Sequence, residues 1–155
     1  MKRTVSSLND LSFDLPEGWA VTTDQYKLSN GQGFWNRENY LSKSGKVISL
    51  FELHREPDEF FEYYQRLVES YNLERDFYAL EKQFTLKFGE YEFPVYVIKG
   101  VREEKEFYTL QTYVNCGDRL ACFMIMIDKV CENPKEMIKA NEAFSALAKI
   151  LRTIS

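Results

Sequence analysis

The sequence holds one histidine and only three cysteines among 155 residues. His54 is therefore the only residue that could act as the base of a Ser-His-Asp or Cys-His site, with Cys116 or Cys122 as nucleophile. The spacing of these two cysteines and Cys131 matches no zinc or redox motif, so we expect reduced thiols. We therefore predict no catalytic residue, no metal site and no cofactor. A hydrolase built around His54 is the enzyme alternative.

Long apolar runs and an excess of positive charge are also missing. Lys2 and Arg3 are not followed by the apolar segment that a secretory signal requires, and no window approaches the length of a membrane span. With 20 basic and 24 acidic residues the formal net charge is −4, and no basic stripe is present. These features argue against nucleic acid or an anionic membrane surface as a partner. We expect a cytoplasmic protein, unless a leader has been removed.

Phosphate loops and acid–base pairs are not indicated either. The glycines of 30–33 (NGQG) and the Gly-Lys of 42–46 (SKSGK) precede predicted strands, whereas a phosphate cradle needs the start of a helix. Glu90 and Glu92 are expected to be exposed rather than to form a carboxylate pair with a raised pKa.

Apolar and aromatic residues, in contrast, are plentiful. Hydrophobic residues make up 45% of the chain, with 12 Phe, 10 Tyr and 2 Trp. A chain of this length can bury a full core, and no repeat or linker divides it, so 1–155 is predicted to be a single domain. Alternation and turn signals predict strands at 11–15, 33–42, 46–54, 77–88, 91–100, 106–115 and 119–128. Two of them, 46–54 and 119–128, are apolar on both faces, as central strands are.

Two helices are predicted from apolar residues spaced three and four apart. The first covers 57–74 and opens with Pro57; the second covers 134–153, with Asn133 as N-cap and Pro134 at its first position. Short connections between the strands require antiparallel neighbours. The expected fold is α+β, a helix–sheet–helix sandwich with a mostly antiparallel sheet of six to eight strands.

The beginning and the end of the chain resemble one known family. The opening strand stops at a proline and a tight turn that leads to an aromatic anchor. The residues of this motif are Phe13, Leu15, Pro16, Gly18 and Trp19. Together with the element order and the closing segment 142–155 (EAFSALAKILRTIS), they resemble the PsbP-like superfamily. That superfamily includes the PsbP subunit of photosystem II, a Ran-binding nuclear import factor and the bacterial DcrB-like proteins.

The resemblance implies a small α/β/α domain, usually without enzymatic activity, that binds another protein. Some bacterial relatives act as chaperones for hydrophobic segments of secreted toxins. We expect the chain to differ from the lipoprotein branch of the family, because the sequence shows neither a leader nor a lipid-acceptor cysteine near residue 1.

Aromatic residues on a sheet face, with an arginine nearby, have the composition of a protein-binding surface. The candidate partner-binding residues are Trp35, Arg37, Tyr40, Tyr96 and Tyr113. Each of the aromatic residues could instead cap the core. Alternation places Trp35 and Arg37 on one face and Tyr40 on the other, unless a bulge intervenes.

We therefore predict a non-catalytic binding module, an adaptor or chaperone-like protein, for a protein or hydrophobic peptide segment. It could be a monomer or a homodimer. The alternative binding function is that of an acidic, secretion-chaperone-like homodimer.

Overall fold

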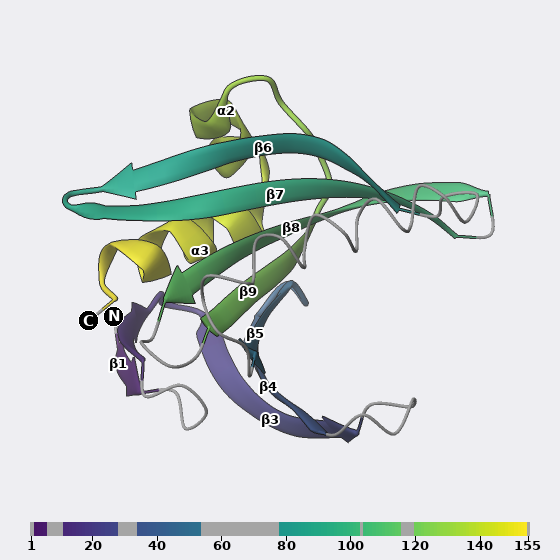
Figure 1. Ribbon diagram of the computed structural model, residues 1–155. Helices are drawn as coiled ribbons and strands as arrows, with labels where there is room; N and C mark the ends of the chain where they lie inside the picture. The colour runs from purple at the N-terminus through teal and green to yellow at the C-terminus, as the bar shows by residue number, and fades with distance from the viewer. Residues whose placement is uncertain are drawn as a thin grey trace.

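The computed structural model describes residues 2–5, 11–27, 34–53, 78–102, 104–115 and 120–154. Figure 1 shows a strongly curved sheet with helices packed against one side, and the two ends of the chain close together. The helix predicted at 57–74 lies outside the described residues, and so do His54 and Cys116. Among the described residues, no helix is long and apolar enough to cross a membrane.

Seven strands form one antiparallel sheet in the order β3-β4-β5-β9-β8-β7-β6, and β1 and β2 form a separate antiparallel pair. The strands are β1 (Lys2–Val5), β2 (Ser12–Leu15), β3 (Trp19–Lys27), β4 (Phe34–Ser42), β5 (Val47–Leu53), β6 (Tyr78–Phe88), β7 (Tyr91–Arg102), β8 (Lys105–Asn115) and β9 (Leu120–Ile127). The helices are α2 (Pro134–Ala140) and α3 (Glu142–Arg152). This arrangement confirms the α+β class and the predicted antiparallel sheet. The two strands predicted to be central, β5 and β9, are both interior to it.

Two strands, β1 and β3, were not predicted. The turn before β3 is the expected one: the backbone N–H of Trp19 donates to the Pro16 carbonyl at 3.2 Å, and Gly18 has a φ of 85°. The chain then continues as a nine-residue strand, where the sequence analysis expected only an aromatic anchor. The β-branched residues Val21 and Thr22, which suit a strand, are the signal that was missed.

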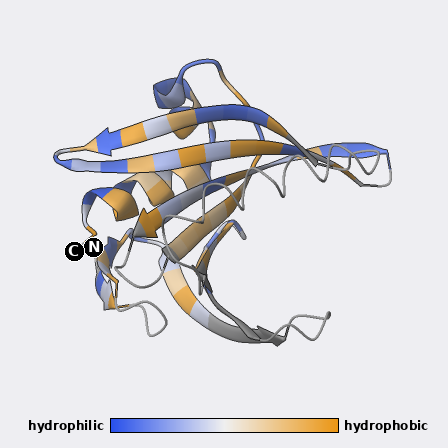
Figure 2. Cartoon of the chain, viewed as in Figure 1, coloured by the Kyte–Doolittle hydropathy of each residue, from blue (hydrophilic) through white to orange (hydrophobic). Residues whose placement is uncertain are grey.

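The core lies on one side of the seven-stranded sheet, called here the first face. Helix α3 contacts β2, β5 and β9 on this face. Phe13 of β2 packs edge-on against Tyr40 and Phe123, with ring centroids 5.6 and 5.9 Å apart. Phe144 of α3 contacts Phe84 of β6, with ring centroids 6.4 Å apart. Figure 2 shows apolar residues alternating with polar ones along β6 and β7, as a strand with distinct faces requires.

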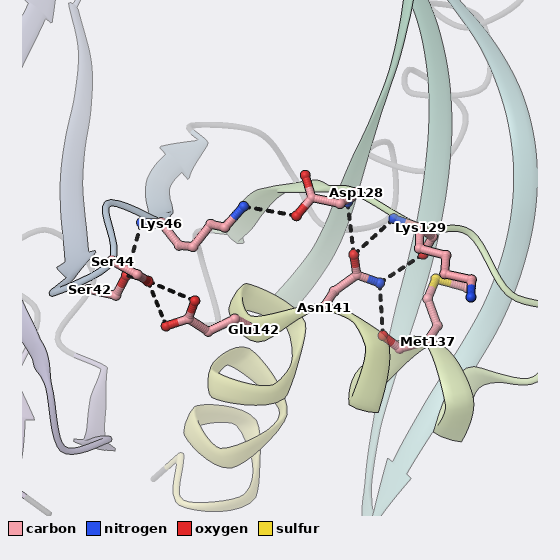
Figure 3. A network of polar contacts seen from close by, with 8 residues as sticks. All are labelled: Ser42, Ser44, Lys46, Asp128, Lys129, Met137, Asn141 and Glu142. Atoms are coloured by element: carbon pink, nitrogen blue, oxygen red, sulfur yellow. Dashed lines mark hydrogen bonds and ion pairs between the residues drawn. The ribbon is translucent and has the colours of Figure 1, made fainter.

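The single helix predicted at 134–153 is wrong in one respect, because the chain breaks into α2 and α3 at Asn141. Asn141 has an extended backbone, with φ −125° and ψ 115°. Its buried amide makes four hydrogen bonds: Oδ1 accepts from the N–H groups of Asp128 and Lys129, and Nδ2 donates to the carbonyls of Lys129 and Met137 (Figure 3). These bonds connect the end of β9 to the helices, and they stabilise the break at Asn141 relative to one continuous helix. The predicted cap at Asn133 is confirmed, since its side chain accepts from Lys135 N–H at 2.8 Å.

We expect Asn141→Leu to lower the free energy of unfolding by about 2–4 kcal/mol, because it leaves several buried backbone groups without partners. Urea denaturation measures this loss. The matched control is Asn133→Ala, which removes an exposed cap and should cost about 1 kcal/mol. A loss for Asn141→Leu no larger than that of the control would contradict the role assigned to Asn141.

Candidate functional site

The predicted aromatic residues Tyr96 and Tyr113 lie together on the second face, opposite α3. Their ring centroids are 5.6 Å apart, with an interplanar angle of 60°. The Tyr113 hydroxyl donates to Gln111 Oε1 at 2.7 Å, and burial raises the pKa of Tyr96. However, the two residues are only 6% and 4% exposed. They form a buried pair on neighbouring strands rather than the lining of an open groove.

Tyr40 lies on the first face and belongs to the core. It is fully buried, and its hydroxyl donates to the buried Glu38 carboxylate, Oε2, at 2.8 Å. Burial, reinforced by the charge of Glu38, raises the pKa of the Tyr40 hydroxyl above its ordinary range. The prediction that Tyr40 lines a partner-binding groove is therefore corrected, because a core side chain cannot reach a partner at the surface.

Trp35 and Arg37 are placed by backbone register alone. Trp35 pairs with Tyr26 of β3. Arg37 pairs with Phe51, which pairs with Cys122, which in turn pairs with Tyr113. Arg37 and Tyr113 therefore occupy one row across four strands, while Tyr40 lies on the alternate face, as alternation predicted. The side chains of Trp35 and Arg37 lie outside the described part of the structure.

Three further candidates for reactive groups, Cys122, Glu90 and Glu92, lie among the described residues. Burial raises the pKa of the Cys122 thiol to about 12, although a hydrogen bond with Tyr113 acts in the opposite direction. Glu90 and Glu92 are both exposed, as expected, and Glu92 pairs with Lys87 at 3.5 Å. No group of three or more His, Cys, Asp or Glu residues in the described ranges could hold a metal ion.

The second face carries an exposed apolar row that the sequence analysis missed. Leu41 of β4 pairs with Val47 of β5, and one further step in the β5–β9 register places Val47 opposite Met126 of β9. The three residues are 40%, 40% and 55% exposed. We call Leu41, Val47 and Met126 the apolar strip. It crosses three neighbouring strands at one end of the sheet, and exposed apolar side chains gathered in this way are typical of an interaction site.

A second, mostly polar row lies beside the apolar strip, two residues away from it on β4, β5 and β9, and continues onto β8. Asn39, Ser49, Met124 and Gln111 pair in sequence across β4, β5, β9 and β8. Ser49 Oγ donates to Asn39 Oδ1 at 2.8 Å, and Gln111 Nε2 contacts Met124 Sδ at 3.8 Å. Asn39 and Ser49 are buried. The apolar strip is thus bordered by a row in which three of the four side chains are polar and make hydrogen bonds.

The turn between β4 and β5 is fastened to the helical layer, which fixes two residues of the apolar strip. Ser44 Oγ lies 2.8 and 2.7 Å from the two carboxylate oxygens of Glu142, and Lys46 Nζ lies 2.8 Å from Asp128 Oδ2 (Figure 3). The ion pair raises the pKa of Lys46. Leu41 and Val47 flank this turn, so an apolar pair that straddles a Lys-Ser-Gly turn is the signal that could have revealed the strip.

No family model and no curated protein sequence matches this chain. Its structure, however, is similar to the solution structure of cyanobacterial PsbP (CyanoP) from Synechocystis sp. PCC 6803, with a TM-score of 0.58 and 9% identity, over 99% of this chain and 91% of that chain. The chain has a PsbP-like fold. A second structure with some similarity is that of PA94 from Pseudomonas aeruginosa, a protein of unknown function, with a TM-score of 0.49 and 11% identity over 95% of this chain and 94% of that chain.

We expect Cys122 to resist alkylation in the folded protein. With a pKa of about 12, only about one thiol in ten thousand is ionised at pH 8, and the thiolate is the reactive form. Native protein treated with iodoacetamide at pH 8 should be modified at Cys131, which is partly exposed, long before Cys122. Peptide mass spectrometry measures the order, and unfolded protein is the control. Modification of Cys122 as fast as Cys131 would contradict its placement.

Proposed function

We propose that this protein is a non-catalytic module that binds an apolar polypeptide segment, as an adaptor or chaperone-like protein does. The observation that carries the proposal is the apolar strip: three exposed apolar side chains aligned across three paired strands. A PsbP-like fold is compatible with such a role. Burial raises the pKa of Cys122, one of the two candidate nucleophiles of a hydrolase built around His54, and so speaks against the version of that site that would use Cys122.

The strip accounts for part of a binding free energy. Covering an exposed apolar side chain of this size contributes on the order of 1 kcal/mol, so three of them contribute about 3 kcal/mol, or roughly a hundredfold in affinity. Because the strip lies on a hydrogen-bonded sheet and its turn is tied to Glu142 and Asp128, little ordering is needed on binding.

A second copy of this chain, rather than a separate polypeptide, could also cover the apolar strip. Size-exclusion chromatography with light scattering distinguishes the two cases. Binding of a separate segment predicts mainly monomer, whereas a secretion-chaperone-like homodimer predicts a dimer at every accessible concentration. The capture of protein partners from the native cytoplasm, identified by mass spectrometry, then tests which segment is bound.

We expect the double variant Leu41→Ser, Met126→Ser to weaken binding at least tenfold, because it removes most of the apolar contact while leaving the core intact. The probes are octapeptides enriched on the wild-type protein from a display library that mixes linear and helix-presented sequences. Fluorescence anisotropy measures their affinity for each variant. Val5→Ser is the matched control, since Val5 is an exposed apolar residue of β1, away from the strip.

Equal affinity of the double variant and the wild-type protein for every enriched octapeptide would contradict the proposal. Circular dichroism and thermal melting verify that the variants remain folded. A large loss with Val5→Ser would instead place the binding surface on the β1–β2 pair.

A further inference from the structure

Asn39 stands out on the second face because half of its side-chain amide has no partner among the described residues. The residue is only 8% exposed, and it lies on β4 two positions before Leu41 of the apolar strip. Its Oδ1 accepts from Ser49 Oγ, and its backbone carbonyl accepts from Thr22 Oγ1 at 3.3 Å. The Nδ2 group, which carries two donors, meets no acceptor among the described residues.

An unpaired buried amide is uncommon, since nearly all buried polar groups find a hydrogen-bond partner. Asn141, the other asparagine that is buried among the described residues, uses both ends of its amide in four bonds. The Ser49 hydroxyl can either donate or accept a hydrogen bond. If the Asn39 amide were rotated by 180°, Nδ2 would bond to this hydroxyl, and Oδ1 rather than Nδ2 would be the unbonded group. Either way, one polar end of the amide, next to the apolar strip, is unbonded within the ranges that the structure describes.

We infer that the apolar strip binds its partner segment in an extended conformation, with a backbone group of that segment hydrogen-bonded to the Asn39 amide. This inference rests on the proposed function. An extended backbone presents free C=O and N–H groups alternately beside its side chains, whereas the backbone groups inside an α-helix are already bonded to one another. A helix laid on the strip would therefore bury Asn39 completely and leave its amide unpaired, which is costly.

The dimensions of the strip suit a short extended segment. Three neighbouring strands place the outer two strip residues about 10 Å apart, since strands are spaced by about 4.8 Å. Three to four extended residues, at about 3.3 Å each, cover that distance. The two side chains that such a segment turns toward the sheet can together contact Leu41, Val47 and Met126, and its backbone passes beside the polar row.

The test uses the mixed display library on the full-length protein. We expect the enriched octapeptides to come from the linear class, and the best of them to shift the Asn39 side-chain NH₂ signals in ¹⁵N–¹H correlation spectra. Asn39→Asp removes both donors and should weaken that octapeptide about tenfold in fluorescence anisotropy. Asn39→Leu serves the same purpose if the aspartate variant fails to fold. Asn133→Asp is the matched control, because aspartate also caps a helix and the site is exposed and distant.

Enrichment of helix-presented sequences, or unchanged affinity in both Asn39 variants, would overturn the inference. If the Leu41→Ser, Met126→Ser variant still weakens binding in that case, the proposed function stands and only the extended conformation is wrong. If no octapeptide of either class is enriched on the wild-type protein, both fail.

Discussion

The register of β9 between β5 and β8 determines which residues reach each face of the sheet. β9 is the central strand, and all of its pairings are antiparallel and without a recorded bulge. Because side chains alternate along a strand, a slip of one residue would exchange the two faces. Phe123 and Ile125 would then leave the core, and Met124 and Met126 would enter it. The buried aromatic contact between Phe123 and Phe13 and the packing of α3 hold this register.

As a result, the two faces of the sheet differ in composition and in exposure to solvent. The first face is closed by β2 and α3 over a continuous apolar core. The second face changes along its length, from the buried Tyr96–Tyr113 pair, through a row of polar groups, to the exposed apolar strip. A surface that combines apolar contact with a buried amide half unpaired among the described residues has the elements of polypeptide recognition, in which side chains supply affinity and backbone hydrogen bonds fix the conformation.

Local patterns predicted most of the fold but not the site. Strand periodicity and turn residues were enough for seven of the nine strands and for their antiparallel pairing, and Gly18 takes the positive φ that its turn requires. The break at Asn141 depends on groups of β9 that lie more than ten residues away, so helical periodicity could not reveal it. Of the candidate aromatic residues, Tyr96 and Tyr113 lie side by side, but their burial is a property of the packed sheet that residue type does not reveal. Residue type favoured Tyr40 as a surface anchor, whereas packing against Phe13 places it in the core.

Methyl-resolved NMR of the leucine, valine and methionine side chains, recorded as a bound octapeptide is added, tests the central claim most directly. The account predicts the largest shifts at Leu41, Val47 and Met126, with little change at Val5 or at the core residue Leu86. Shifts concentrated at Val5, or on the first face, with the apolar strip unaffected would contradict it.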